Sequence, residues 1–230
     1  MVALLDLRPG DIMLDAQTEP DLLLRFAHDR VGERGRCIGM AFGQNTVQRV
    51  EQQIDKWALP GMQLMIGHPS MPLPLKAELC HGLILRSSYG IPRLSTAFDN
   101  LDRLAKPGAR VLTRHTEWTV KLPKVSEQEQ LMIDALQAPG CADGQEFFQR
   151  FAQHRPRGWR DVRYDVYTIA SRDPRASVRH GYDWRTMMRE QLGKARVFTP
   201  RQILDLICRL EETRGAKVTV DRYLALAIKP

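Results

Sequence analysis

The sequence predicts an α+β fold in which helices pack around a small, mostly antiparallel sheet. The composition is that of a globular protein, with 43% hydrophobic and 27% charged residues. Short apolar runs bounded by turn residues are typical of strands, and other stretches place apolar residues at helical spacing. The 230 residues are enough for one large domain, or for one domain with a small appendage.

The first third of the chain is expected to contain both kinds of element. Leu4 to Leu14 has the pattern of a strand, a Pro-Gly turn and a second strand. Residues 20–30 and 46–59 have helical spacing, and the apolar runs at 37–42 and 62–66 are predicted as strands.

The middle of the chain begins with a loop and continues with strands. Residues 67–74 include three prolines, so we expect a rigid loop, either a docking loop or a plain connector. A central strand is predicted at 79–85, and 91–104 is expected to end in a short helix. Residues 110–113 and 117–122 are predicted as a strand pair.

The C-terminal half has the clearest helix signals. Ser126 and Glu129 have the spacing of a capping box, and Thr199 followed by Pro200 has the pattern of a helix N-terminus. We expect helices from these starts and at 143–153 and 184–192, with strands at 164–169, 218–220 and 223–228.

Composition also excludes several classes of protein. No stretch approaches the ~18 consecutive apolar residues that indicate a membrane span. The N-terminal apolar run lacks a basic region and is interrupted by Asp6 and Arg8, so it is not a secretory signal and we expect a cytosolic chain. The cysteines lack CxxC spacing, so we expect free, mostly buried thiols and no structural zinc or disulfide framework. They are Cys37, Cys80, Cys141 and Cys208.

The positive charge is concentrated in one segment. Between Arg150 and Arg201 there are 13 Lys/Arg and 5 Asp/Glu, whereas the whole chain has a net charge of +7. Arginines mixed with aromatic rings suit nucleic acid or another anionic partner, although a solvated surface is an equal alternative. The predicted polyanion-binding residues are Arg155, Arg157, Trp159, Arg160, Arg163, Arg172, Arg175, Arg179 and Arg185.

A cysteine and two histidines are the candidate catalytic residues. Cys141 follows a Pro-Gly pair and precedes a helical stretch, where a helix N-terminus would lower its thiol pKa. His81 on the central strand is the candidate base, and His115 could orient it. The alternative is that all three are structural. No Walker A, GxGxxG, HExxH or GxSxG motif is present, and no cofactor or metal is predicted.

The segment LRPGDIML resembles the opening strand of permuted NlpC/P60 (papain-like) proteins of the YiiX-like group. Arg36 to Gly43 resembles their histidine strand, with Cys37 where the histidine would be, which implies an inactive relative. In an alternative alignment with the same family, His81 corresponds to the base and Cys141 to the nucleophile, which implies an active enzyme. Phe198 to Leu210 resembles a terminal helix of the group. The resemblance implies thiolate attack on an amide or ester of the cell-wall peptide type, and such modules occur in phage virions.

Two hypotheses follow, with the question of enzymatic activity left open. The first is a cysteine hydrolase or its inactive relative, located in the cytosol or in a phage virion. The second is a non-enzymatic structural or binding component whose arginine-rich surface contacts nucleic acid, another polyanion or a protein assembly. The expected organisation is a core at 1–154 with the candidate site and a basic, mainly helical part at 155–230.

Overall fold

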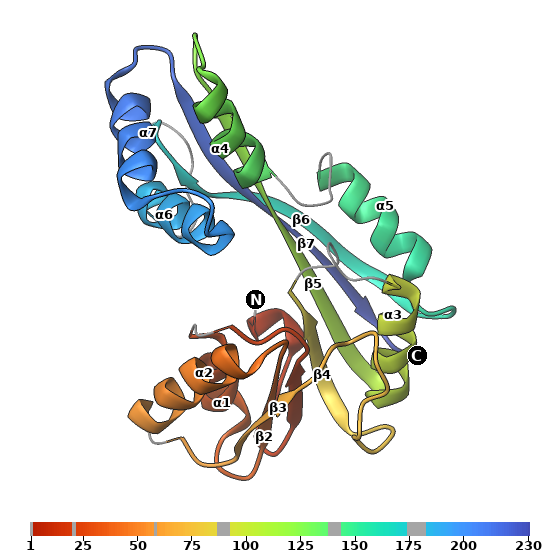
Figure 1. Ribbon diagram of the computed structural model, residues 1–230. Helices are drawn as coiled ribbons and strands as arrows, with labels where there is room; N and C mark the ends of the chain where they lie inside the picture. Colours follow the sequence, from red (N-terminus) through yellow and green to blue (C-terminus); the bar gives the residue numbers. More distant parts are fainter. Residues whose placement is uncertain (1, 20–21, 58, 87–92, 138–143, 174–182) are drawn as a thin grey trace. The chain divides into compact units, whose positions relative to one another are not determined.

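The computed structural model describes residues 2–19, 22–57, 59–86, 93–137, 144–173 and 183–230 (Figure 1). The N-terminal elements are η1 (Val2–Leu5), β1 (Ile12–Asp15), α1 (Leu23–Val31), β2 (Arg36–Ala41), α2 (Gln44–Trp57), β3 (Met62–Ile66), β4 (Cys80–Leu85) and α3 (Leu94–Leu104). They are followed by β5 (Ala105–Lys121), α4 (Glu127–Gln137), α5 (Gly144–His154), β6 (Arg160–Ser171), α6 (Trp184–Ala195), α7 (Pro200–Glu212) and β7 (Lys217–Ile228).

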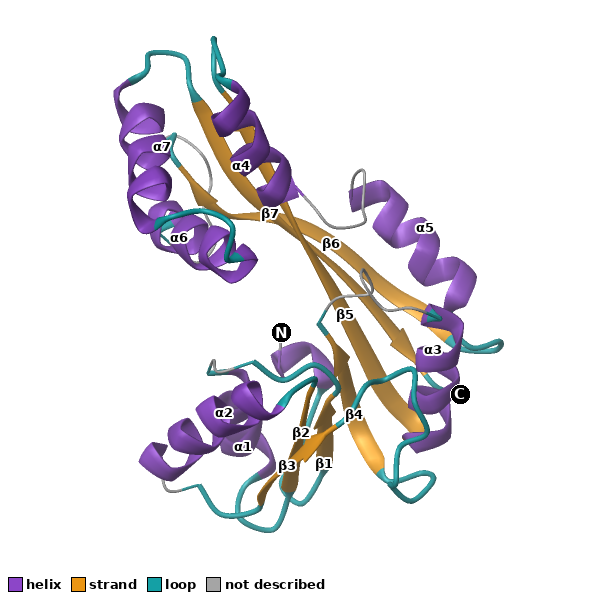
Figure 2. Ribbon diagram, viewed as in Figure 1, coloured by secondary structure: helices purple, strands orange, loops and turns teal. Residues whose placement is uncertain are grey.

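The strands form a seven-stranded sheet in the order β3-β2-β1-β4-β5-β7-β6. β1 pairs in parallel with β2 on one side and with β4 on the other. The β2–β3 and β4–β5 pairs are also parallel. The arrow of β7 runs against that of β5, so the sheet is mixed but mostly parallel (Figure 2).

The predicted fold class, a small and mostly antiparallel papain-like sheet, is therefore wrong. α1 separates β1 from β2, and α2 separates β2 from β3. A crossover helix returns the chain to the edge where the previous strand began, so the next strand runs parallel. The opening segment is not a hairpin, because η1 precedes β1, and the predicted strand pair at 110–122 is part of one strand, β5.

The chain divides into two compact units that each combine distant segments. The first unit contains 1–114, 148–164 and 224–230, and the second contains 115–147 and 165–223. Both units thus take residues from each side of the boundary expected near residue 155.

The strands of the first unit are apolar because they are buried in its core. Met13, Leu14, Leu83 and Ile84 of β1 and β4 have no exposed surface. Strands of a parallel sheet are covered on both faces, so they are apolar along most of their length. In Figures 1 and 2, α1 and α2 cover one face and α3 covers the other.

The second unit has a core of its own, to which α4, α6 and α7 contribute. Trp118 of β5, Met188 of α6 and Leu210 of α7 are among its buried residues. The start of α7 confirms the prediction from sequence: the Thr199 side chain accepts a bond from the Gln202 amide, and the Gln202 side chain accepts one from the Thr199 amide.

Candidate functional site

The first unit has one place where the order of the sheet reverses. β1 is followed along the chain by β2 and β3 on one side, whereas β4 pairs with β1 on the other side. Open α/β sheets bind ligands outside the carboxyl ends of their strands at such a reversal. The carboxyl ends of β1 to β4, called the carboxyl edge below, are therefore the candidate site.

A buried ion pair joins the ends of β1 and β4 at this edge. The Arg86 Nε donates to both carboxylate oxygens of Asp15, at 3.1 and 2.9 Å, and its Nη2 also donates to Oδ2. The side chains of Asp15 and Arg86 are 0% and 3% exposed. The Gln17 amide also donates to Asp15, at 3.3 Å. The carboxylate is thus neutralised and hydrogen-bonded from within the chain.

The turn after β1 folds onto the neighbouring strand ends. The Ala16 amide donates to the Ile84 carbonyl at 2.8 Å, and the Thr18 amide donates to the Met40 carbonyl at 2.7 Å. The Thr18 hydroxyl donates to the Asp15 carbonyl at 3.2 Å. Thr18 is only 2% exposed, so its side chain fills space directly over β2.

Two rings stack at the ends of β2 and β3. Phe42 follows β2 and His68 lies two residues beyond β3, with ring centroids 4.7 Å apart and planes at 28°. The Ser70 amide donates to His68 Nδ1 at 3.1 Å. Because Nδ1 accepts this bond, the proton of the neutral ring resides on Nε2.

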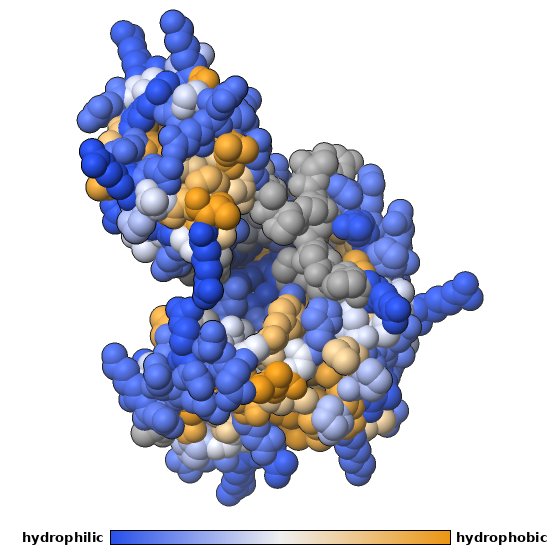
Figure 3. All heavy atoms as spheres, in the orientation of Figure 1, coloured by the Kyte–Doolittle hydropathy of each residue, from blue (hydrophilic) through white to orange (hydrophobic). Residues whose placement is uncertain are grey.

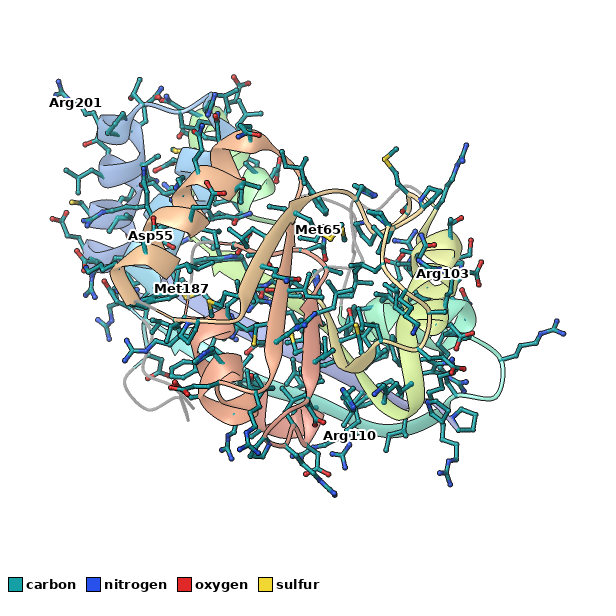
Figure 4. All side chains as sticks on the ribbon, turned by 90° about the horizontal axis from the view of Figure 1, so that it is seen from below. Asp55, Met65, Arg103, Arg110, Met187 and Arg201 are labelled. Atoms are coloured by element: carbon teal, nitrogen blue, oxygen red, sulfur yellow. The ribbon has the colours of Figure 1, made fainter. Side chains whose placement is uncertain are left out.

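The segment that carries His68, residues 67–75 and called the strap below, is fixed on α3. The Asn100 side chain donates to the Pro69 and Met71 carbonyls, both at 2.8 Å. Arg103, labelled in Figure 4, donates to the Leu73 and Leu75 carbonyls at 2.8 and 2.7 Å. Alternate carbonyls of the proline-rich strap are thereby held by side chains of one helix.

The structure describes two of the three predicted catalytic residues, and Cys141 lies outside the described residues. His81 is near the start of β4, where its Nδ1 accepts the Ile12 amide at 3.0 Å. Its Nε2 lies 3.0 Å from Lys106 Nζ and 3.5 Å from an Asp11 oxygen. His115 lies on β5, two residues beyond Thr113, the partner of Leu85, and belongs to the second unit. It stacks with Phe147.

The titrating groups at these places are mostly disfavoured in their charged forms. Burial, with Lys106 nearby, lowers the pKa of His81, and Asp11 opposes the shift. Burial lowers the pKa of His115 as well. Burial raises the pKa of the Cys37 and Cys80 thiols to about 12. Both thiols are therefore protonated and inert at neutral pH.

The described residues among the predicted polyanion-binding set are divided between the two units, and their environments differ. Trp159 is 4% exposed and donates to Asp102 at 2.7 Å. Arg172 donates to the Thr213, Ala216 and Glu211 carbonyls at the end of α7. Arg185 pairs with Glu211 and Asp183. Arg157, Arg160 and Arg163 are exposed, Arg155 donates to the Trp159 carbonyl, and Arg175 and Arg179 lie outside the described residues.

No protein-family model and no curated protein matches the sequence. Solved structures do match. They include a SAM-dependent methyltransferase from Aquifex aeolicus (17% identity, 69% of this chain, 77% of that chain, TM-score 0.53) and the YcgJ protein from Bacillus subtilis (12%, 100%, 96%, 0.63). Another is the [4+2]-cyclase SpnF (13%, 100%, 79%, 0.63). The chain has the fold of the SAM-dependent methyltransferases. At these identities the likeness shows the fold alone.

This fold corrects the resemblance to permuted NlpC/P60 proteins. The hydrolase and phage interpretations depended on that resemblance, and the similar structures include methyltransferases instead of papain-like hydrolases. The shared feature was the Gly-Asp turn before a strand, which precedes a parallel strand here. The comparisons also give no support to the nucleic-acid alternative.

Several of the similar structures are named as SAM-dependent methyltransferases or contain SAM, and the residues of this chain do not fit that cofactor. In sheets that hold nucleotides, glycines in the first βα turn let the backbone approach the ligand, and an acid near the end of β2 bonds the ribose. Residues 15–22 contain no glycine, and residues 41–47 contain no acid. The available carboxylate, Asp15, is already bound by Arg86.

The residues that define the carboxyl edge were missed in the sequence. Asp15 and Arg86 are 71 residues apart in sequence, so only the strand order brings them together. A signal was present: Asp15 and Arg86 each directly follow an apolar run. In a parallel sheet such positions meet at one edge.

Two features of the described part bear on membranes and metals. None of its helices is long and apolar enough to cross a membrane. Its residues also contain no group of three or more His, Cys, Asp or Glu side chains arranged to hold a metal ion.

Proposed function

We propose that this chain is a small-molecule-binding protein of the methyltransferase fold that works at the carboxyl edge without methyl transfer from SAM. The Asp15–Arg86 pair carries the proposal, since it lies where the sheet order reverses and is almost completely buried. A buried ion pair is weak evidence for stability, because removing two charges from water offsets their attraction. Because the Arg86 guanidinium binds the Asp15 carboxylate, that carboxylate is not available to bind a cofactor.

The turn after β1 supports the same conclusion. A ligand that needs close backbone approach would meet the Thr18 side chain, which is buried over β2. Gly39 shows how tight this packing is, because a Cβ built there would lie 2.7 Å from the Thr18 hydroxyl oxygen. The space above β2 is therefore filled by the chain itself.

Isothermal titration of the full chain with SAM and S-adenosylhomocysteine tests the proposal. We expect no saturable heat and no thermal shift. A ligand at one hundred times its Kd stabilises a protein by about 2.7 kcal/mol, so binding would be visible. The Aquifex aeolicus methyltransferase, titrated in the same buffer, is the positive control. Saturable binding of SAM to this chain would contradict the proposal.

SAM-dependent methyl transfer is the second candidate, and the structural similarity to methyltransferases favours it. It predicts SAM binding that Asp15→Asn weakens, because the carboxylate at the end of β1 would then face the ligand. That result would replace the first proposal. A cytosolic location and contact with an anionic partner remain predictions from the sequence.

A further inference from the structure

Three kinds of interaction fix the position of His68 at the carboxyl edge. Its ring stacks on Phe42, its Nδ1 accepts the Ser70 amide, and its backbone belongs to the strap that Asn100 and Arg103 fix on α3. Side chains that contact ligands are commonly oriented in this way by their neighbours.

The orientation determines which atom is available. With Nδ1 occupied, the neutral ring can offer only its Nε2–H, which is a donor. Within the described part of the chain, this nitrogen has no hydrogen-bond partner. Phe42, on which the ring stacks, is 50% exposed, and Met71, whose amide donates to the His68 carbonyl at 2.9 Å, is 60% exposed. Figure 3 shows hydrophobic residues at the surface of the first unit, among hydrophilic ones.

We propose that His68 is a ligand-binding residue whose Nε2–H donates to an oxygen of an apolar carboxylate bound at the carboxyl edge. An N–H donor beside an exposed aromatic ring suits a molecule with an acceptor oxygen and a hydrophobic body. Phe42 acts as a positioning residue that keeps the imidazole plane fixed and adds apolar contact. This inference rests on the proposed function, because it identifies the class of ligand for the same edge.

The test uses 2-naphthoate as the probe on the full chain, with two-dimensional NMR of the histidine ring nitrogens. We expect saturable binding that moves the His68 Nε2 resonance. 2-Naphthylmethylamine has the same ring system but a cationic donor in place of the carboxylate, so it should bind at least tenfold more weakly. Equal binding of the two probes, or an unmoved His68 resonance, would overturn the proposal.

Three variants separate the roles of donor and ring. His68→Phe keeps a ring to stack on Phe42 but removes the donor, so 2-naphthoate should bind roughly tenfold more weakly, as expected for one lost hydrogen bond. His68→Gln retains a donor near the position of Nε2 and should recover part of the affinity. Phe26→Leu changes an equally exposed phenylalanine on α1 and should bind normally. Unchanged affinity of His68→Phe would sink the inference.

The outcomes distinguish the two proposals. Binding of SAM would contradict the proposed function whatever the probe does. Failure of 2-naphthoate to bind, together with failure of SAM, would remove the ligand class while leaving the SAM-independent function intact.

Discussion

Asp15 and Arg86 are oppositely charged side chains that are almost completely buried. Removing both charges from water costs free energy, and this desolvation cost affects how the pair at the carboxyl edge is interpreted. Arg86 donates three hydrogen bonds to the two oxygens of Asp15, and the Gln17 amide adds a fourth. These hydrogen bonds offset the desolvation cost of the two buried charges, but the pair adds little to the free energy of unfolding. We interpret the pair as a fixed internal contact at the position where a ligand would otherwise bind: the Arg86 guanidinium occupies the Asp15 carboxylate.

A double-mutant cycle measures what the pair contributes. Arg86→Leu leaves a buried carboxylate without its counter-charge, so the free energy of unfolding should fall by about 3–5 kcal/mol. Asp15→Leu should cost a similar amount. The double variant should be clearly more stable than the sum of the two losses predicts, because no lone charge remains. Urea unfolding followed by circular dichroism gives all four values, and simple additivity would refute this account.

His81 makes stability depend on pH with a definite sign. Its pKa is lower in the folded chain than in the unfolded one, because burial and Lys106 disfavour the imidazolium. The unfolded state therefore binds more protons, and stability falls as the pH drops below about 6.5. His81→Gln should lose less stability than the wild type between neutral and mildly acidic pH. Parallel urea curves for the two proteins would contradict this.

Residue patterns identified apolar strands but could not reveal which residues meet. Asp15 was visible only as the end of a short run, and Arg86 only as a charge before a turn. His81 and His115 looked like partners because both lie on predicted strands. His81 lies on β4 in the first unit, whereas His115 lies on β5 in the second. Distance along a strand depends on pairing, which a single sequence does not contain.

At the scale of elements, the strap shows how a proline-rich segment becomes fixed. Prolines cannot donate, so the segment has few backbone donors for a sheet. Its carbonyls remain available, and α3 binds four of them through Asn100 and Arg103. The rigidity expected from sequence is thus a property of the strap together with the helix.

Removing one clamp should loosen the strap selectively. Asn100→Ala removes two hydrogen bonds of 2.8 Å, so we expect a loss of about 1–3 kcal/mol in the free energy of unfolding. Amide exchange should rise at the strap, and the His68 ring signals should broaden. Asp99→Ala on the same helix is the control, because that side chain is exposed. Equal effects of both variants would show that Asn100 does not hold the strap.

Most helices were predictable because their signals are local. Ser126 with Glu129 and Thr199 with Pro200 mark starts that the structure confirms. The parallel arrangement was missed although strands and helices alternate in the first third of the chain. The Pro-Gly turn in LRPGDIML is typical of a hairpin, whereas β1 and β2 are joined by α1. Strand direction follows from connections, which are less visible than the elements themselves.

At the scale of the whole molecule, the positive charge of the segment from Arg150 to Arg201 has to be considered together with the division of the chain into two units. The excess of arginine between Arg150 and Arg201 extends over both units. Part of it is structural, since Arg172 binds three carbonyls near the end of α7, where a cation is also favoured by the helix dipole. Arg172 is thus engaged within the chain, whereas contact of the exposed arginines with an anionic partner remains a prediction.

Two separate hydrophobic cores predict that the units can loosen one at a time. Leu210 of α7 and Leu101 of α3 both have no exposed surface, and each belongs to a different unit. Replacing either by Ala creates a cavity that costs about 2–5 kcal/mol. Leu210→Ala should raise amide exchange in α4, α6 and α7 while the β1 and β4 amides stay protected. Leu101→Ala should do the reverse, and its expected loss of free energy is the same. Hydrogen exchange with mass spectrometry resolves both patterns. If either variant raised exchange equally throughout the chain, the two units would form one cooperative body, because local openings follow the contacts of their own core.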